Sequence, residues 1–304
     1  MIERAVELLQ RGRLVAFPTE TVYGLGADAT NPSAVARIFA AKGRPSTNPL
    51  IVHVHSVASA RRYSAGWPDS ATRLAERFWP GPLTIVLPKQ PTIVDSVTAG
   101  LATVGLRVPD HPVALELLRA FDGAVAAPSA NQSNHVSPTT AQHVRDELGD
   151  SVDLVLDGGA CSVGIESTVV DLSGAIPRIL RPGGVSASAI AAVVGEVHSC
   201  SRIGGGSTVL PTTPAPSPGM QERHYAPRTP AFRFLPEQRA SIDVTDAAML
   251  DITLDPAQYS RLLYAHLRML DQQQLRAIYI ELPPDVPEWA AVRDRIIRAT
   301  QLLE

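Results

Sequence analysis

Cysteine and lysine are both scarce in this chain, and each scarcity limits what it can be. Only Cys161 and Cys200 occur among 304 residues, which excludes a disulfide scaffold and a cysteine-rich zinc site. Cys161 lies in DGGACSVG, and we interpret it as a buried or incidental thiol because no Cys–His arrangement accompanies it. Only Lys42 and Lys89 are lysines among 27 basic residues. Arginine therefore supplies nearly all of the positive charge.

Long apolar runs and an excess of either charge are also missing. No run approaches the roughly 18–20 residues that span a bilayer. The first residues are charged from position 3 and lack a secretory apolar segment, which predicts a cytoplasmic protein without membrane contact. A formal net charge of −3 argues against a general nucleic-acid binder but allows a local basic groove. With 45% hydrophobic residues, the chain can bury one large core or two ordinary ones.

Short apolar runs alternate with amphipathic segments over the first two hundred residues. Patterns typical of strands lie at 13–17, 49–54, 82–88, 102–109, 123–130, 153–159, 167–173 and 177–183. Helical spacing after a polar or proline start lies at 31–42, 111–121 and 137–150. Several connections between strands are too short for a helix, so the pattern predicts an α/β domain with a mixed sheet.

The composition changes at Gly204. The stretch 204–230 is dense in Gly, Pro, Ser and Thr, which predicts an interdomain linker. Its triple glycine lacks the Lys-Ser/Thr of a phosphate-binding P-loop. Beyond it, strands at 231–236 and 276–283 and helices near 259–270 and 289–303 indicate a small α/β domain. We therefore expect domains at 1–203 and 231–304.

The Gly/Pro-rich stretch AKGRPSTNPLIVHV contains Lys42 and Arg44. An ammonium is a point charge, whereas a guanidinium is a planar bidentate fork, so the two do different work. A clamp for a polyanion and an ordinary solvated loop both remain open on these residues alone.

The segment PTETVYGLGADA follows the first strand and loosely fits G-x-G-x-x-A. That dinucleotide motif fails here, because Thr-Glu-Thr separates strand and glycines and the position for the acidic residue falls near Asn48. What remains is a set of hydroxyls, Thr19, Thr21 and Tyr23, suited to a small polar ligand.

His53 and His55 are expected to share one face of a strand. A metal pair is conceivable, but no third ligand has recognisable spacing, and a histidine hydrogen-bonded in a pocket is favoured.

Polar side chains are dense in APSANQSNHVSPTT. Ser129 and Asn131 follow a strand, and Ser137 is expected to cap the next helix, where its N-terminus attracts anions.

Arg107 and Arg181 end two predicted strands, and ligands of open α/β sheets bind at strand carboxyl ends. We expect both to converge with the cationic loop. Glu20 and Glu166 are the lone acids near these motifs, and no nucleophile stands out. Cations with hydroxyls fit electrostatic positioning of phosphates.

Taken in order, these motifs resemble the threonylcarbamoyl-AMP synthase family, specifically its longer Sua5-type members. The matching segments are FPTETVYGLGADA, KGRPSTNPLIVHV, FWPGPLTIVL, VGLRVPDHP, APSANQSNHVSPT, ESTVVDL and ILRPG. SPGMQERHYAP is similar to the family's linker, and LYAHLRMLDQQQLRAIYIE to its C-terminal domain. The resemblance implies a YrdC-like twisted mixed sheet with flanking helices, followed by a smaller Rossmann-like α/β domain.

The resemblance also implies a reaction, in which L-threonine, bicarbonate or CO2, and ATP with Mg²⁺ give threonylcarbamoyl-adenylate and pyrophosphate. The product would supply N6-threonylcarbamoyladenosine (t6A) of tRNA through downstream transfer proteins; direct tRNA contact is possible but is not implied by the charge. Two rival interpretations are a related carbamoyl transferase of the same superfamily and an RNA-binding module.

The resemblance assigns roles residue by residue. It implies catalytic roles for Lys42 and Arg44, and no metal ligands from the protein. ATP would be bound by Lys42, Arg44, Asn48, Thr103, Asn131, Ser137, Thr139, Arg181, His224 and Tyr225. Threonine would be bound by Thr19, Thr21, Tyr23, His53, Arg107, Ser129 and Ser167. The linker would fold over the site. Departures from the family pattern lie at Gln221, Glu222 and Asp294 and in a shortened second domain.

Overall fold

The computed structural model describes residues 1–199 and 224–303. Residues 1–199 form a mixed ten-stranded sheet in the order β10-β9-β8-β4-β5-β3-β6-β2-β1-β7. Its strands are β1 (Val15–Phe17), β2 (Gly24–Asp28), β3 (Ile51–His53), β4 (Leu83–Pro88), β5 (Thr103–Arg107), β6 (Val125–Ala126), β7 (Leu154–Val155), β8 (Thr168–Asp171), β9 (Arg178–Arg181) and β10 (His198–Ser199). Parallel and antiparallel pairs both occur, as in β3–β5 and β4–β5. The predicted mixed sheet is confirmed.

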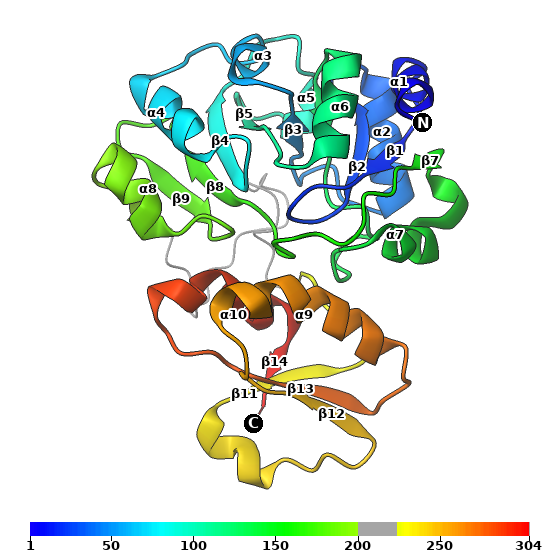
Figure 1. Cartoon of the computed structure of the whole chain (residues 1–304), viewed down its shortest axis with the longest axis vertical. Coiled ribbons are helices and arrows are strands. Elements are labelled where there is room, and N and C mark those ends of the chain that lie inside the picture. The colour runs from blue at the N-terminus through cyan, green and yellow to red at the C-terminus, as the bar shows by residue number, and fades with distance from the viewer. Residues whose placement is uncertain (200–223, 304) are drawn as a thin grey trace.

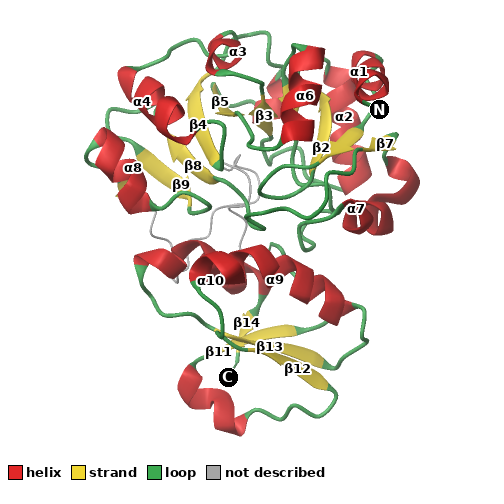
Figure 2. Cartoon of the chain, viewed as in Figure 1, coloured by secondary structure: helices red, strands yellow, loops and turns green. Residues whose placement is uncertain are grey.

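Helices cover both faces of this sheet (Figures 1 and 2). They are α1 (Ile2–Gln10), α2 (Pro32–Lys42), α3 (Val57–Arg61), α4 (Asp69–Phe78), α5 (Asp95–Thr98), α6 (Pro112–Phe121), α7 (Ala141–Leu148) and α8 (Ala187–Val194), with a 3₁₀ turn at Gly149–Ser151. Because side chains alternate along a strand, Ala16 packs into the core beneath α2, whereas Val15 and Phe17 pack against α1 and α6. A strand buried on both faces reads as a continuous apolar run.

Helix α2 sets the position of the cationic loop. Asn31 caps its start by accepting from the amides of Ser33 and Ala34, and Gly43 ends it in the left-handed region at φ 57°. Glycine adopts that backbone without strain. Lys42 is thus the last helical residue, and the chain turns sharply before Arg44.

The second domain is a parallel four-stranded sheet in the order β12-β13-β11-β14. Its elements are β11 (Ala231–Phe234), β12 (Ala247–Leu250), α9 (Pro256–Asp271), β13 (Ala277–Glu281), α10 (Ala290–Ala299) and β14 (Gln301–Leu302), with 3₁₀ turns at Pro236–Ser241 and Pro287–Trp289. Helices α9 and α10 lie on the side of this sheet that faces the first domain (Figure 1). Their apolar side chains share one buried cluster with Val22, Val136 and Ile165, so the two domains are packed together.

Several predicted elements differ from the structure. The segments at 123–130 and 153–159 form only two-residue strands. The predicted helix at 289–303 is wrong at its end, because Gln301 and Leu302 pair with β11 instead. Ser137 does not cap α7; that helix begins after Thr140, whose hydroxyl accepts from the amide of His143. The elements that were not predicted are the strands β2, β10 and β12 and the helices α1, α3, α4, α5 and α8.

Candidate active site

Lys42 is buried, with 2% of its surface exposed. Its Nζ donates to the carbonyl oxygens of Ser129, at 2.6 Å, and of Asn131. Burial, followed by the nearby charge of Arg44, holds the pKa of Lys42 well below its usual value. A solvated loop is therefore the wrong interpretation of this stretch.

Arg44 is buried beside it and is fixed by the backbone. Its Nε donates to the carbonyl of Asn48 at 3.3 Å, and Nη2 to that of Pro49 at 3.0 Å. Burial lowers the pKa of Arg44 to about 10; Tyr225 and Arg181 also lie close enough to influence it. Both amide atoms of the Asn48 side chain are buried without a hydrogen-bond partner among the described residues.

A second cationic group is centred on Arg107 at the end of β5. Its Nη2 lies 2.7 Å from Glu20 Oε1 in a buried ion pair and donates to Thr21 Oγ1 at 2.9 Å. Its Nε donates to the Gly81 carbonyl at 3.3 Å. His53 is its register partner on β3. Burial, with the charge of Arg107, lowers the pKa of His53 to about 3, so the imidazole is neutral at physiological pH.

Ser167 lies just before β8 and contacts Arg181 at the end of β9 and Thr84 of β4. Arg181 donates to the Ser167 carbonyl from Nε at 3.2 Å and from Nη2 at 3.0 Å, and to its hydroxyl at 3.3 Å. The Ser167 hydroxyl also lies 2.8 Å from Thr84 Oγ1. Arg181 and Ser167 are therefore held as a unit.

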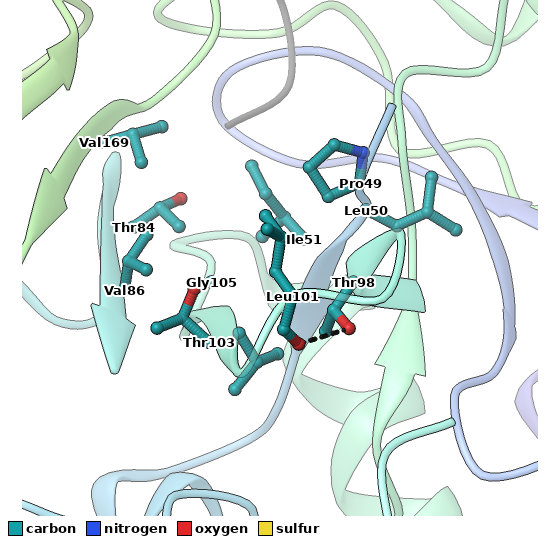
Figure 3. A pocket seen from close by; sticks show the side chains of 11 residues that line it. Pro49, Leu50, Ile51, Thr84, Val86, Thr98, Leu101, Thr103, Gly105 and Val169 are labelled. Atoms are coloured by element: carbon teal, nitrogen blue, oxygen red, sulfur yellow. Dashed lines mark hydrogen bonds between the residues drawn. The ribbon is translucent and has the colours of Figure 1, made fainter. Parts of the chain in front are cut away.

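Thr84 also lines a pocket between β3, β4, β5 and β8 (Figure 3). Apolar side chains such as Ile51 and Val169 form most of the walls, and Thr98 and Thr103 add polar atoms. Thr98 Oγ1 donates to the Leu101 carbonyl at 2.9 Å. Thr103, expected from the sequence to touch ATP, lines this pocket.

Glu166 lies between the two domains. Its Oε1 accepts from Ser137 Oγ at 2.6 Å, and its Oε2 accepts from Tyr264 at 2.9 Å and from Arg295 Nε at 2.7 Å. Burial alone would raise the pKa of Glu166, but Arg295 and Arg181 and these hydrogen bonds lower it to about 2. The Ser137 hydroxyl serves this carboxylate and is not available as a helix cap.

His224 and Tyr225 begin the second described range and are both buried. The His224 amide donates to the Arg298 carbonyl at 3.1 Å, and the two aromatic rings meet edge to face with centroids 4.0 Å apart. Burial and then the charge of Arg44 hold the pKa of His224 well below its usual value; Lys42 acts in the same direction. The structure thus brings this pair beside the cationic loop.

Three predicted hydroxyls make contacts within the fold. The Tyr23 hydroxyl donates to the Gly159 carbonyl at 2.8 Å. Thr19 Oγ1 donates to the Val22 carbonyl at 2.7 Å. Thr139 Oγ1 lies 3.4 Å from His143 Nδ1. These contacts shape the loops around the site.

Burial and contacts bear on two further sequence hypotheses, the His53–His55 metal pair and the buried Cys161 thiol. His55 lies beyond the end of β3 and pairs with Asp122 at 3.2 Å, which does not support a metal pair with His53. No cluster of three or more His, Cys, Asp or Glu suited to a metal occurs in the described residues. Cys161 is buried, as expected, and burial raises the pKa of its thiol to about 12.

Buried polar atoms without a partner gather at this site. Within the described ranges they include side-chain atoms of Asn48, His53, Asn131, Ser133, His224 and Tyr225. Because buried polar groups are nearly always hydrogen-bonded, such a concentration indicates a place built to receive a polar ligand.

The sequence did not point to three second-domain side chains that reach this region. Arg295 and Tyr264 bind Glu166, and Arg268 pairs with Glu147 and donates to the carbonyls of Val136 and Ser137. One sequence signal could have found Arg295: charged residues interrupt the apolar face of α10, where Asp294 and Arg295 are buried with Val292 and Ile296.

Comparison with known proteins shows that this chain matches a protein family. The Sua5/YciO/YrdC family model, described as "Telomere recombination", matches residues 7–183, which is more than half of the chain. The chain belongs to the Sua5/YciO/YrdC family. A second family model, "Threonylcarbamoyl-AMP synthase, C-terminal domain", matches residues 185–301.

Relatives of this family are close in sequence and in fold. Threonylcarbamoyl-AMP synthase of Pyrococcus abyssi is 46% identical over 226 residues, covering 74% of this chain and 65% of the relative. That of Bacillus subtilis is 47% identical over 230 residues, covering 75% and 65%. The matched region thus spans just under two thirds of the length of both relatives. The crystal structure of P. abyssi Sua5 complexed with L-threonine has a TM-score of 0.91 at 37% identity, covering 100% of this chain and 96% of that one.

No helix in the described part of the chain is both long and apolar enough to cross a membrane.

Proposed function

We propose that this protein joins L-threonine, bicarbonate or CO2, and ATP into L-threonylcarbamoyladenylate with release of pyrophosphate, for t6A modification of tRNA. The observation that carries the proposal is the meeting of buried cations with unpartnered polar atoms. Lys42, Arg44 and Arg181 lie beside Asn48 and His224 in the described structure. Family membership and the likeness to a threonine-bound structure support the same conclusion.

Threonine would bind around Arg107, with Thr21, His53, Ser129 and Ser167. A guanidinium forms strong, charge-assisted hydrogen bonds with an amino-acid carboxylate. Arg107 is already oriented by Glu20 and Thr21, so it costs little to hold it in place when the ligand arrives. The neutral imidazole of His53 offers a buried Nδ1 without a partner among the described residues. The loop hydroxyls of Thr19 and Tyr23 support this pocket through the backbone.

ATP would bind along the cationic loop. Lys42, Arg44 and Arg181 would neutralise the triphosphate. Thr103 lines a cavity of about 20 Å³, which has room for little more than one water, so the base would lie outside it. Asn48, Asn131, Ser137, Thr139, His224 and Tyr225 would complete the nucleotide site. We expect Mg²⁺ to accompany ATP, held by phosphate oxygens and water.

The chemistry requires positioning more than an activated side chain. The threonine nitrogen forms a bond to the carbon of CO2 and loses a proton, giving a carbamate. A carbamate oxygen then attacks the α-phosphorus while the bond to the pyrophosphate oxygen breaks. Fixed cations stabilise the charge on the leaving pyrophosphate without reorganising. Holding reactants in line can lower the barrier by roughly 7–11 kcal/mol.

The proposal is tested by identifying the product. Incubation with ATP, threonine and ¹³C-bicarbonate should give an adenylate that carries both the threonine and the label, detected by mass spectrometry of rapidly quenched samples. An unlabelled adenylate, or threonyl-adenylate without the carbamoyl carbon, would contradict it.

A further inference from the structure

Arg295 of α10 is fully buried, at 0% exposure, yet it belongs to the second domain. Its three guanidinium nitrogens have different partners. Nε donates to Glu166 at 2.7 Å, Nη1 to Asp294 at 2.5 Å, and Nη2 to the carbonyl of Pro182 at 3.0 Å. A planar fork is needed to satisfy acceptors in three directions, which the single nitrogen of lysine cannot do with the same geometry.

Two of these partners flank residues of the proposed site. Glu166 immediately precedes Ser167, and Pro182 immediately follows Arg181, while Arg181 donates to Ser167 through three contacts. The two segments are packed tightly: a side-chain carbon on Gly183 would come within 2.4 Å of the backbone of Glu166, Ser167 and Thr168. Arg295 therefore holds both ends of one rigid unit.

Arg295 also contacts Tyr225. Its guanidinium carbon lies 5.2 Å from the Tyr225 ring centroid, within the range of a cation–π interaction. Tyr225 has a φ of +64°, a backbone conformation that is costly for a bulky residue and persists only when its surroundings enforce it. Tyr264 also packs against this ring, with centroids 5.7 Å apart.

We propose that Arg295 is a positioning residue, through which the second domain sets the placement of Ser167, Arg181 and Tyr225 around the substrates. This inference rests on the proposed function for its kinetic consequences, but not for its structural ones. It assigns the second domain a direct part in building the site of the first. The residue touches no substrate itself.

The test compares Arg295→Lys and Arg295→Met with a control, Arg239→Ala. Arg239 forms an exposed ion pair with Asp251 inside the second domain, so its loss tests general effects of removing an arginine there. Three measurements are made on each full-length variant: the thermal midpoint, KM and kcat from pyrophosphate release, and hydrogen–deuterium exchange of peptides covering 165–169 and 181–185.

We expect Arg295→Lys to stay folded at the assay temperature, with KM for threonine and ATP raised on the order of 10- to 100-fold, as for small misplacements of binding groups. Amide exchange should accelerate in both peptides and stay unchanged in them for Arg239→Ala. Unchanged KM values in a folded Arg295→Lys, or faster exchange confined to the second domain, would overturn the proposal.

The two proposals fail in different ways. If the unaltered protein releases no pyrophosphate, the proposed function is wrong, and the exchange measurement alone then decides the role of Arg295. If the unaltered protein is active but the variants show only a lowered thermal midpoint, Arg295 serves stability and not positioning.

Discussion

Replacing Glu166 by glutamine should destabilise the protein strongly and in a pH-dependent way. The carboxylate accepts hydrogen bonds from Ser137, Tyr264 and Arg295. Glutamine would place an NH2 group, which is itself a donor, against at least one of these donors. Its pKa of about 2, against an ordinary 4.5, corresponds to roughly 3 kcal/mol of stabilisation at about 1.4 kcal/mol per unit. Leaving Arg295 buried without its partner adds to the loss.

The pH dependence has a definite sign. Because the pKa of Glu166 is lowered in the folded protein, its stabilisation is fully present above pH 4.5 and is lost as the pH falls toward about 2. The stability difference between Glu166→Gln and the unaltered protein should therefore shrink from roughly 3 kcal/mol at about pH 7 to roughly 2 kcal/mol at about pH 3.5.

Urea unfolding at both pH values measures this difference. The matched control is Glu7→Gln, which removes an exposed pair with Arg4 and should cost about 0–1 kcal/mol. A loss at neutral pH no larger than that of the control, or a difference that grows on acidification, would refute the reasoning.

Three further predictions concern single residues of the site. Lys42→Arg should raise KM for ATP by about tenfold or more, because a guanidinium cannot replace an ammonium that donates to two buried carbonyls; unchanged steady-state kinetics would contradict this. Gly183→Ala should cost about 1–3 kcal/mol by overpacking, whereas Gly174→Ala, with no atom within 4 Å of the added carbon, should be nearly neutral in the same unfolding assay. The pH profile of KM for threonine should show no ionisation of His53 near its ordinary 6.5, because its pKa in the fold is about 3; an inflection there that His53→Gln abolishes would be the opposite result.

Much of the first domain could be predicted because its signals are local. The apolar run at 82–88 and the asparagine–proline start at 31–32 correspond closely to β4 and α2. Arg107 and Arg181 do end strands, as the pattern indicated. Strand β2 was missed because its residues Gly24–Asp28 include glycine and aspartate, which are poor strand formers. It is held between β1, which is near in sequence, and β6, which is distant.

The contacts between domains could not be predicted, because no local pattern records them. Arg295 and Glu166 are 129 positions apart. Arg295 interrupts the apolar face of α10, but nothing in either segment identifies the other residue as its partner. The expected cap at Ser137 failed for the same reason: its hydroxyl is directed to Glu166 by tertiary structure. The roles of the site residues toward threonine and ATP remain predictions, and the linker segment at 204–223, with Gln221 and Glu222, lies outside the described residues.

The most direct test of the proposed synthase activity is pyrophosphate release from ATP with threonine and bicarbonate omitted in turn. If the buried cations hold the reactants in line against ATP, pyrophosphate is released only when threonine and bicarbonate are both present. Release that continues without threonine, or no release with every component and Mg²⁺ supplied, would contradict the assignment.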